Sequence, residues 1–429
     1  MAEEILKEAV KEEVSAVGPV EILIGIPSYN NAQTVRHVVK AAQAGLLNYF
    51  PDRKALIVNS DGGSNDGTPE VVKQADVDAQ SLMLVSHPLY PVHRLTTPYH
   101  GLPGKGSAFR TLFRIAELAH AHALAVVDAD LRSITPEWFN LLLQPILTLE
   151  FDYVAPFYKR HKYDGTITNS IVYPFTRALY GRRIRQPIGG EFGISGRLAG
   201  HFLTRDVWNT DVARYGIDIW MTTTAIAENF KVCQSYLGAK IHDPKDPGSH
   251  LSGMLVQVIG SVFSLMETYD SVWRNVLGSL PAPLLGFPFE VGLEPVPINV
   301  QRTLASFQQG VRDLRPIYEK VLTLQQLREL ESCAAQPIDK FVLEDELWVA
   351  VIYSFALAYH RRVLDREHLV KSLTPLYLGW VTSFVHQTEN ETPTQVDDRI
   401  ERLCLVYEQL KPYLINQWPL QTGEKRSES

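Results

Sequence analysis

The chain contains 429 residues, 45% of them hydrophobic, and carries a formal net charge of −7 at pH 7. This acidic balance argues against a nucleic-acid partner, because non-specific nucleic-acid binding depends on clustered positive charge. Three widely spaced cysteines exclude a disulfide scaffold and any zinc site built on paired cysteines, and they favour a reducing compartment. At about 150 residues per domain, the length predicts two or three domains.

The N-terminal segment, residues 1–19, alternates acidic and apolar residues and is expected to form a short amphipathic helix or a mobile arm. It lacks the cationic start and the apolar block of a secretory signal. The longest apolar stretch, residues 254–266, is shorter than the roughly 20 residues that cross a bilayer, so no stable membrane insertion is expected. These features predict a cytoplasmic protein.

Residues 20–250 alternate short apolar runs with helical patterns. Strands are predicted at 21–27, 54–61, 81–88 and 124–131, and helices at 30–47, from 68 onward, within 103–122 and from 135 onward. Thr68 and Thr135 each precede a proline, which is typical of a helix cap followed by the first helical position. The alternation predicts an α/β domain whose mostly parallel sheet is covered on both faces, with ligands bound beyond the carboxyl ends of the strands.

Helical periodicity dominates after residue 250. It covers the segments 251–278, 300–335, 341–364, 366–388 and 393–414, which are separated by Pro-rich joints such as LPAPLLGFPFEVGLEPVP. We therefore predict a helical C-terminal region over 251–420, which packs on the sheet domain or offers an oligomer surface, and a homodimer is expected. The polar residues 421–429 predict a disordered tail.

Two carboxylates, Asp128 and Asp130, end the apolar run LAVVDADL. Residues i and i+2 of a strand point to the same side, and two carboxylates on one side need a cation or hydrogen-bond donors to offset their charge. Mg²⁺ and Mn²⁺ prefer such oxygen ligands, usually together with the phosphates of a substrate. The alternative interpretation is a helix cap beside a surface acid.

Two glycine-rich segments follow other predicted strands. In LPGKG (102–106), the glycines would let the backbone approach a phosphate and Lys105 would supply positive charge, although the segment also suits a plain loop. It is not a Walker A loop, because a glycine rather than Ser or Thr follows Lys105. In SDGG (60–63), Asp61 either accepts hydrogen bonds from a base or ribose or simply forms a turn.

Three further polar segments lie between apolar ones: QPIGGE (186–191), YGID (215–218) and AKIH, which ends at His242. Glycines permit close approach of a ligand, and Glu191 and Asp218 are candidates to orient sugar hydroxyls. Asp218 is expected near a helix N-terminus, where it could instead serve only as a cap. His242 suits a surface loop, or a ligand of a Mn²⁺-like ion when carboxylates share the site.

The ordered set IGIPSYN, NSDGGSNDGT, LPGKG, VVDADL, QPIGGE, YGID and AKIH resembles the retaining GT-A glycosyltransferases of the mannosylglycerate synthase and glucosyl-3-phosphoglycerate synthase (glucosylglycerate synthase) group. The resemblance covers roughly residues 20–250. The helical segment FVLEDELWVAVIYSFALAYH is also similar to the tail of mannosylglycerate synthase. The resemblance as a whole implies a GT-A, Rossmann-like nucleotide-sugar domain followed by a helical region.

The resemblance also implies a role for each matched residue. The nucleotide-sugar site would contain Pro27, Tyr29, Asp61, Lys105, Asp128, Ala129, Gly189, Gly190 and Glu191. Asp218, Glu191 and Lys105 would serve catalysis, and Arg160 and Thr168 would bind the acceptor carboxylate. The divalent cation, Mg²⁺ or Mn²⁺, would be held by Asp130, His242 and Asp128.

The implied reaction is the metal-dependent transfer of glucose or mannose, with retention, from GDP-mannose, GDP-glucose or UDP-glucose to glycerate or 3-phosphoglycerate. The product class would be the compatible solutes mannosylglycerate and glucosylglycerate. One alternative is a glycosyltransferase that acts on a polyprenyl-phosphate or saccharide acceptor, which predicts membrane-spanning or basic amphipathic segments. The other is a non-catalytic sugar-nucleotide binding protein, which predicts loss of the aspartates or the lysine, although all are present.

Overall fold

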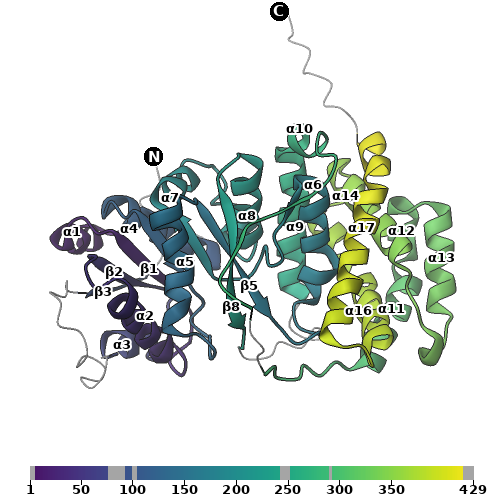
Figure 1. The fold of residues 1–429 in the computed structure, drawn as a ribbon. Helices are drawn as coiled ribbons and strands as arrows, with labels where there is room; N and C mark the ends of the chain where they lie inside the picture. Colours follow the sequence, from purple (N-terminus) through teal and green to yellow (C-terminus); the bar gives the residue numbers. More distant parts are fainter. Residues whose placement is uncertain (1–4, 76–91, 99–103, 242–251, 289–291, 419–429) are drawn as a thin grey trace, which may run out of the picture.

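The computed structural model describes residues 5–75, 92–98, 104–241, 252–288 and 292–418. Figure 1 shows an α/β sheet unit at one end of the molecule and a group of helices, α11 to α17, at the other. The predicted α/β class with a helical C-terminal region is therefore confirmed. The 81–88 strand prediction, His242 and the 421–429 tail lie outside the described residues.

The main sheet has the strand order β10-β8-β5-β7-β4-β1-β2-β3 in the part of the chain that the structure describes. Its strands are β1 (Ile22–Ser28), β2 (Ala55–Asp61), β3 (Val92–Pro98), β4 (Ala123–Val126), β5 (Tyr153–Lys159), β7 (Phe192–Ser195), β8 (Val232–Ala239) and β10 (Leu284–Leu285). Strand β7 runs antiparallel to β4 and β5, and the other neighbouring pairs are parallel. The sheet is thus mixed but mostly parallel, as in a GT-A fold.

Helices cover both faces of the sheet, which explains why its strands are almost continuously apolar. Along β1, Ile22, Ile24 and Ile26 join the core beneath α2 (Val35–Tyr49) and α5 (Pro136–Leu149). The alternate residue Leu23 joins the core on the opposite face. That face is covered by α4 (Lys105–Leu118) and α7 (Gly196–Leu203). Figure 1 shows α2 and α5 lying alongside the sheet.

Several predicted boundaries were wrong by a few residues. Helix α2 begins at Val35 rather than Asn30, because side chains of the β2–α3 loop hold the backbone of residues 30–32 in a loop. Helix α3 (Thr68–Lys73) is capped by Gly67, and the Thr68 hydroxyl instead donates to Asp66, so Thr68 is not the cap. Thr135 does stand at the cap position of α5, with Pro136 following it.

The helical region has more helices than the periodicity predicted, because caps interrupt the long segments. The 251–278 segment contains α9 (Ser252–Thr268) and α10 (Asp270–Trp273). The next segment divides into α11 (Val300–Asp313), α12 (Arg315–Val321) and α13 (Leu324–Ala334), where Pro316 starts one helix and a Thr323–Gln326 capping box starts another. The remaining helices are α14 (Asp345–His360), α15 (Arg366–Ser372), α16 (Thr374–Thr388) and α17 (Pro393–Gln417).

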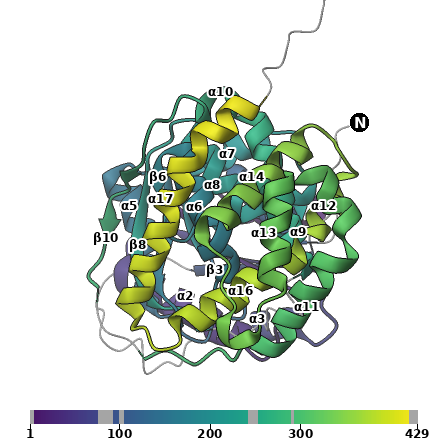
Figure 2. The same ribbon diagram turned by 90° about the vertical axis from the view of Figure 1, so that its right-hand side faces the viewer.

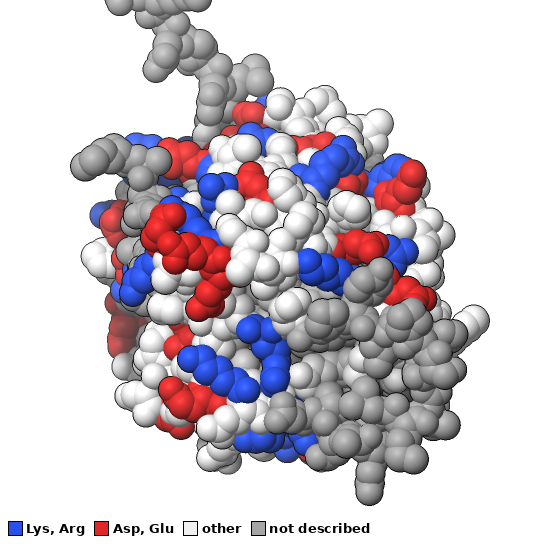
Figure 3. Space-filling view, turned by 90° about the vertical axis from the view of Figure 1, so that its left-hand side faces the viewer, with Lys and Arg blue, Asp and Glu red and all other residues white. Residues whose placement is uncertain are grey.

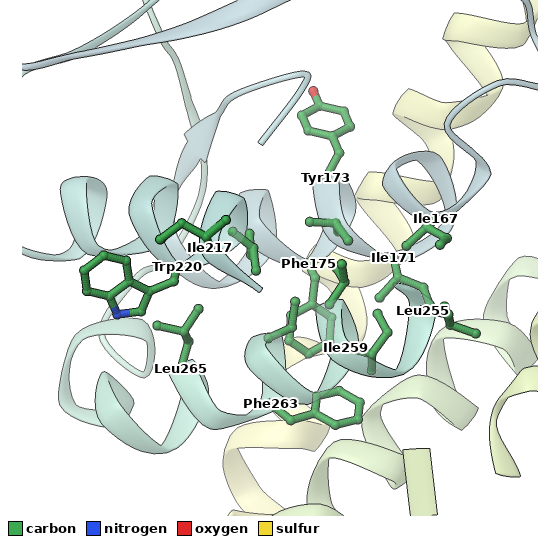
Figure 4. Packing of buried hydrophobic residues seen from close by; sticks show 14 of the residues in the cluster. Ile167, Ile171, Tyr173, Phe175, Ile217, Trp220, Leu255, Ile259, Phe263 and Leu265 are labelled. Carbon is green, nitrogen blue, oxygen red and sulfur yellow. The ribbon is translucent and has the colours of Figure 1, made fainter. Parts of the chain in front are cut away.

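The helical region packs directly on the sheet unit. Helix α17 lies along α6 (Tyr173–Tyr180), where the buried Arg177 guanidinium pairs with Glu401 and, at 2.8 Å, with Glu408 (Figure 2). Figure 4 shows apolar side chains of α9, including Ile259 and Phe263, gathered against Phe175 of α6. The linker after α10 also returns to the sheet as β10, so strands do continue beyond residue 250, contrary to the sequence prediction.

No helix in the described ranges is both long and apolar enough to cross a membrane. On the face of the sheet unit shown in Figure 3, basic and acidic side chains are interspersed. Within the N-terminal arm, α1 (Glu8–Val17) buries Val10 and Val14 and packs near α4, so the amphipathic-helix alternative holds for these residues.

Candidate active site

A cavity of about 990 Å³ opens beyond the carboxyl ends of the parallel strands, where the α/β pattern placed the ligand site. It brings together most of the predicted residues, although they come from segments up to two hundred residues apart. Those lining it are Pro27, Tyr29, Lys105, Asp128, Ala129, Asp130, Arg160, Thr168, Gly189, Gly190 and Asp218. Glu191 is fully buried behind this surface, and Asp61 is buried at the end of β2.

Five ionisable side chains form a continuous row of alternating charge at the base of the cavity. Lys105 Nζ lies 3.2 Å from Asp218 Oδ2 and 2.9 Å from Asp128 Oδ1. Lys240 Nζ lies 3.1 Å from the other oxygen of Asp128 and 2.7 Å from Glu191 Oε1. It also donates to the carbonyl oxygen of Gly189 at 2.7 Å. Asp128 is therefore shared by two lysines, and the row runs from Asp218 to Glu191.

Chain geometry places these groups at the ends of elements. Lys105 is the first residue of α4, and Asp218 is the second residue of α8 (Ile217–Ala227), near a helix N-terminus as the sequence predicted for Asp218. Asp128 follows β4, which ends two residues earlier, at Val126. The expectation that Asp128 and Asp130 share one face of a strand is therefore wrong, because both lie in the loop after the strand.

The glycines around Lys105 serve packing between chain segments. A Cβ on Gly106 would lie 1.8 Å from the carbonyl oxygen of Val212, and the Gly106 amide donates to the carbonyl of Arg214 at 3.1 Å. Residues 104–106 therefore lie directly against the loop that precedes α8. This contact, rather than a phosphate alone, explains the need for glycine, and it brings Lys105 to Asp218.

Gly190 has a similar role on the other side of the row. Its backbone has a φ of +100°, which side-chain-bearing residues rarely adopt, and a Cβ there would lie 2.3 Å from Asp128 Oδ2. The QPIGGE glycine thus leaves room for the Asp128–Lys240 pair and lets the backbone reach the cavity wall.

The row shifts the protonation of its members. Burial opposes the charged form of Lys105, but Asp128 and Asp218 outweigh it and raise the lysine pKa above its ordinary value. Burial alone would raise the pKa of Asp128, but Lys105 and Lys240 hold it well below the usual range. Burial raises the pKa of Asp218, against the pull of Lys105. It also raises the pKa of Glu191 to about 8, against the pull of Lys240.

Both terminal carboxylates of the row keep one oxygen without a protein partner. Glu191 Oε2 and Asp218 Oδ1 are buried and make no hydrogen bond within the described part of the chain, whereas their other oxygens are held by lysines. A buried acceptor without a partner is costly unless a ligand supplies a donor. The two fixed, unpaired oxygens therefore suit a hydroxyl-bearing ligand.

The outer end of the cavity carries an aromatic ring. Tyr29 is 62% exposed and lines the cavity beside Pro27 and Gly62. Asp61 stabilises a turn, which was one of its two predicted roles. Its oxygens accept from the amides of Gly63 and Ser64 and from the hydroxyls of Ser28 and Ser64. Its role in binding a nucleoside stays a prediction.

Arg160 and Thr168 lie on the wall formed by the segment after β5. Arg160 stacks over Tyr158 at 5.1 Å and approaches Asp164 at 3.7 Å, and its buried Nε has no hydrogen-bond partner among the described residues. Thr168 begins a short π-helix (Thr168–Val172), a conformation that occurs often at functional sites. The two residues face the same cavity as the row.

Asp130 is the carboxylate of the site best placed to hold a divalent cation. Both oxygens of Asp128 are occupied by lysines, whereas the Asp130 carboxylate lines the cavity and makes no ion pair or hydrogen bond in the described part of the chain. No group of three His, Cys, Asp or Glu side chains able to hold a metal occurs among the described residues, which do not include His242. Asp130, His242 and Asp128 as ligands stay predictions.

Sequence reasoning missed Lys240. It directly follows β8, two residues before His242, and its amide is held by the carbonyl of Lys159 on the neighbouring strand. The available signal was its place at the carboxyl end of a strand, within the AKIH segment. A lysine there is ordinarily assigned to the surface, but this ammonium is buried between two carboxylates.

The mixed sheet with its ligand cavity at the carboxyl strand ends defines the class as a GT-A-like α/β protein. Residues 23–196 match the family model for Glycosyl transferase family 2. This segment is therefore a nucleotide-sugar-dependent glycosyltransferase domain, and the protein is an enzyme. It includes Lys105, Asp128 and Glu191 but ends before Asp218 and Lys240.

Among solved structures, the chain is similar to glucosyl-3-phosphoglycerate synthase from Mycobacterium tuberculosis. A complex of that protein with Mg²⁺ and uridine-diphosphate shows 20% sequence identity and a TM-score of 0.43, over 62% of this chain and 85% of the other. A complex of the same protein with Mn²⁺, uridine-diphosphate-glucose and phosphoglyceric acid shows 20% sequence identity and a TM-score of 0.42, over 62% of this chain and 86% of the other. Such a distant likeness assigns no substrate. No curated protein matches the chain.

Proposed function

We propose that this enzyme transfers a hexose, glucose or mannose, from a nucleotide diphosphate sugar to a small hydroxy acid such as glycerate or 3-phosphoglycerate. The observation that carries the proposal is the pair of half-free carboxylates, Glu191 and Asp218, at opposite ends of one row of charges. Each lysine holds one oxygen of its carboxylate, and the other oxygen has no hydrogen-bond partner among the described residues. This arrangement favours a polyhydroxylated ligand between them.

The donor would lie along the cavity from Tyr29 to this row. The exposed Tyr29 ring offers a stacking surface for the base, and the glycines beside it permit close approach of the ribose. Lys105 would face the diphosphate, and it remains protonated because two carboxylates raise its pKa. Negative charge that develops on the leaving diphosphate would thus meet a fixed cation.

The sugar would be oriented by the unpaired oxygens of Glu191 and Asp218. Hydroxyls that donate to these oxygens would satisfy two buried acceptors at once, and the bonds would strengthen as positive charge develops on the sugar ring. We expect retention by attack from the same face. The bond from the anomeric carbon to the diphosphate breaks, a bond to the acceptor oxygen forms, and the acceptor proton passes to the leaving phosphate oxygen.

The acceptor would enter beside the segment that carries Arg160 and Thr168. A guanidinium can form two parallel hydrogen bonds with a carboxylate. The buried Arg160 Nε is a donor without a hydrogen-bond partner among the described residues. Both residues line the same cavity as Asp218, so an acid anchored there would direct its hydroxyl at the sugar. A divalent cation bound through Asp130 would offset the charge of the diphosphate.

Incubation of the full chain with UDP-glucose, GDP-glucose and GDP-mannose, with Mg²⁺ or Mn²⁺, tests the proposal. The acceptors are glycerate, 3-phosphoglycerate, glycerol, a disaccharide and a short polyprenyl phosphate. We expect transfer to a hydroxy acid only, with the donor's anomeric configuration retained in the NMR spectrum of the product. Transfer to the disaccharide or the polyprenyl phosphate alone would overturn the acceptor assignment, and an inverted product would overturn the stereochemistry.

A further inference from the structure

The acceptor loop, residues 160–167, is attached to the C-terminal helical region by Lys162. The ammonium of Lys162 donates to three backbone carbonyls, those of Thr388 at 2.6 Å, Glu389 at 2.8 Å and Glu391 at 3.2 Å. The carbonyls of Thr388 and Glu389 lie at the C-terminal end of α16, where the helix dipole attracts a cation, and that of Glu391 lies in the turn that follows. The loop therefore depends on backbone acceptors that belong to the helical region of the protein.

Two more side chains of the loop contact the same helix. The Thr166 hydroxyl lies 2.5 Å from the hydroxyl of Tyr377, and both residues are buried. Tyr163 donates to the carbonyl of Val385 at 3.4 Å, and its ring lies edge-on to Phe384. Lys162, Tyr163 and Thr166 thus contact α16 while Arg160 contributes to the cavity wall.

The π-helix that follows the loop is held by two other helices. The carbonyl oxygen of Ser170 accepts from Trp348 Nε1 of α14 at 3.0 Å and from the Tyr407 hydroxyl of α17 at 2.9 Å. All three residues are buried. Since Thr168 lies two residues before this carbonyl, the side chain expected to bind the acceptor is positioned by helices of the C-terminal region.

We propose that the C-terminal helical region shapes the acceptor subsite, and that Lys162 is a positioning residue that holds the acceptor loop against α16. The inference rests on the proposed function for its ligand, a small hydroxy acid, but the anchoring itself is a separate property of the fold. The nucleotide end of the cavity around Tyr29 belongs to other loops, so acceptor binding should depend on Lys162 and donor binding should not.

Lys162→Met tests this, because methionine keeps an unbranched stem and removes the charge and its donors. We expect the acceptor KM to rise by roughly tenfold, which corresponds to the loss of a charge-assisted hydrogen bond, with the donor KM unchanged. Lys162→Arg should restore most of the acceptor affinity, and Tyr407→Phe should raise the acceptor KM through Ser170. Lys371→Met, at an exposed lysine of α15, is the matched control.

Hydrogen exchange of the amides of residues 160–172 gives a readout that needs no substrate. We expect faster exchange in Lys162→Met than in the wild type and Lys371→Met. Unchanged exchange, or donor and acceptor KM values that rise together, would overturn the inference. A wild-type protein that transfers no sugar would overturn the proposed function instead, and the exchange rates would still decide whether Lys162 anchors the loop.

Discussion

Lys240 and Glu191 form a buried ion pair, with Nζ 2.7 Å from Oε1 and no solvent exposure of the glutamate. The same ammonium reaches Asp128, so one lysine offsets part of the charge of two carboxylates. Taking an ion pair out of water is costly, and a buried pair is weak evidence for stability by itself. Lys240 lines the cavity, so under the proposed function it would hold Glu191 in position for the sugar.

Removal of Lys240 should therefore destabilise the protein. In Lys240→Met, Glu191 and Asp128 both lose a cation, and Glu191, whose pKa burial already raises to about 8, takes up a proton; breaking a buried pair in this way costs up to about 3–5 kcal/mol. The double variant Lys240→Met/Glu191→Gln should recover part of that loss, because glutamine is neutral without taking up a proton. Urea unfolding of the three proteins measures both effects. A double variant no more stable than the single one would show that Lys240 acts mainly through Asp128.

The metal prediction concerns Asp130. Asp130→Ala should leave the melting temperature near that of the wild type, because its carboxylate makes no bond within the described ranges. It should lower Mn²⁺ affinity in the presence of a nucleoside diphosphate by roughly 10–100-fold or more, the range seen when even outer partners of a metal are removed. Calorimetry measures this, and Asp206→Ala, at an exposed loop aspartate, is the control. Full transfer in EDTA would contradict the metal assignment.

The sequence predicted the place of the site better than its contacts. Lys105 and Asp128 converge because parallel strands direct their carboxyl ends to one edge of the sheet, and the start of α8 brings Asp218 to the same place. The row that joins them depends on contacts between distant segments. Gly106 meets the carbonyl of Val212, and Lys240 enters between Asp128 and Glu191. Periodicity describes only neighbours along the chain, so it could not show that a glycine packs on a loop a hundred residues away.

A pH-dependent stability is expected from Lys411, which is buried under α6 and donates to the carbonyls of Ala178 and Val276. Burial lowers the pKa of Lys411 to about 8, against an unfolded value near 10.5. Between these values the unfolded chain binds more protons than the folded one, so this lysine increases the free energy of unfolding as the pH rises from 8 to 10.

The comparison of Lys411→Met with the wild type isolates that effect from tyrosines and cysteines that titrate in the same range. Urea unfolding measures the free energy of unfolding of both proteins. The wild-type value minus the variant value should increase between pH 8 and pH 10. Lys320→Met, at an exposed lysine of α12, should show no such trend. A constant difference between wild type and Lys411→Met would show that the folded pKa is not lowered.

A variant of Asp218 distinguishes two possible roles of this residue, a helix cap and a partner of the sugar hydroxyls. The structure places it at the second position of α8, where its side chain makes no cap hydrogen bond and instead accepts from Lys105 at 3.2 Å. In Asp218→Asn, the amide oxygen can keep that bond, and a buried carboxylate whose pKa is raised is removed, so the melting temperature should change little. The turnover number should fall by about 10²–10³, the usual effect of losing one electrostatic group that acts in the transition state.

Glu137→Gln, at the second position of α5 and outside the cavity, is the matched control and should keep full turnover. Equal turnover in the two variants would reduce Asp218 to a partner of Lys105 with no part in the chemistry.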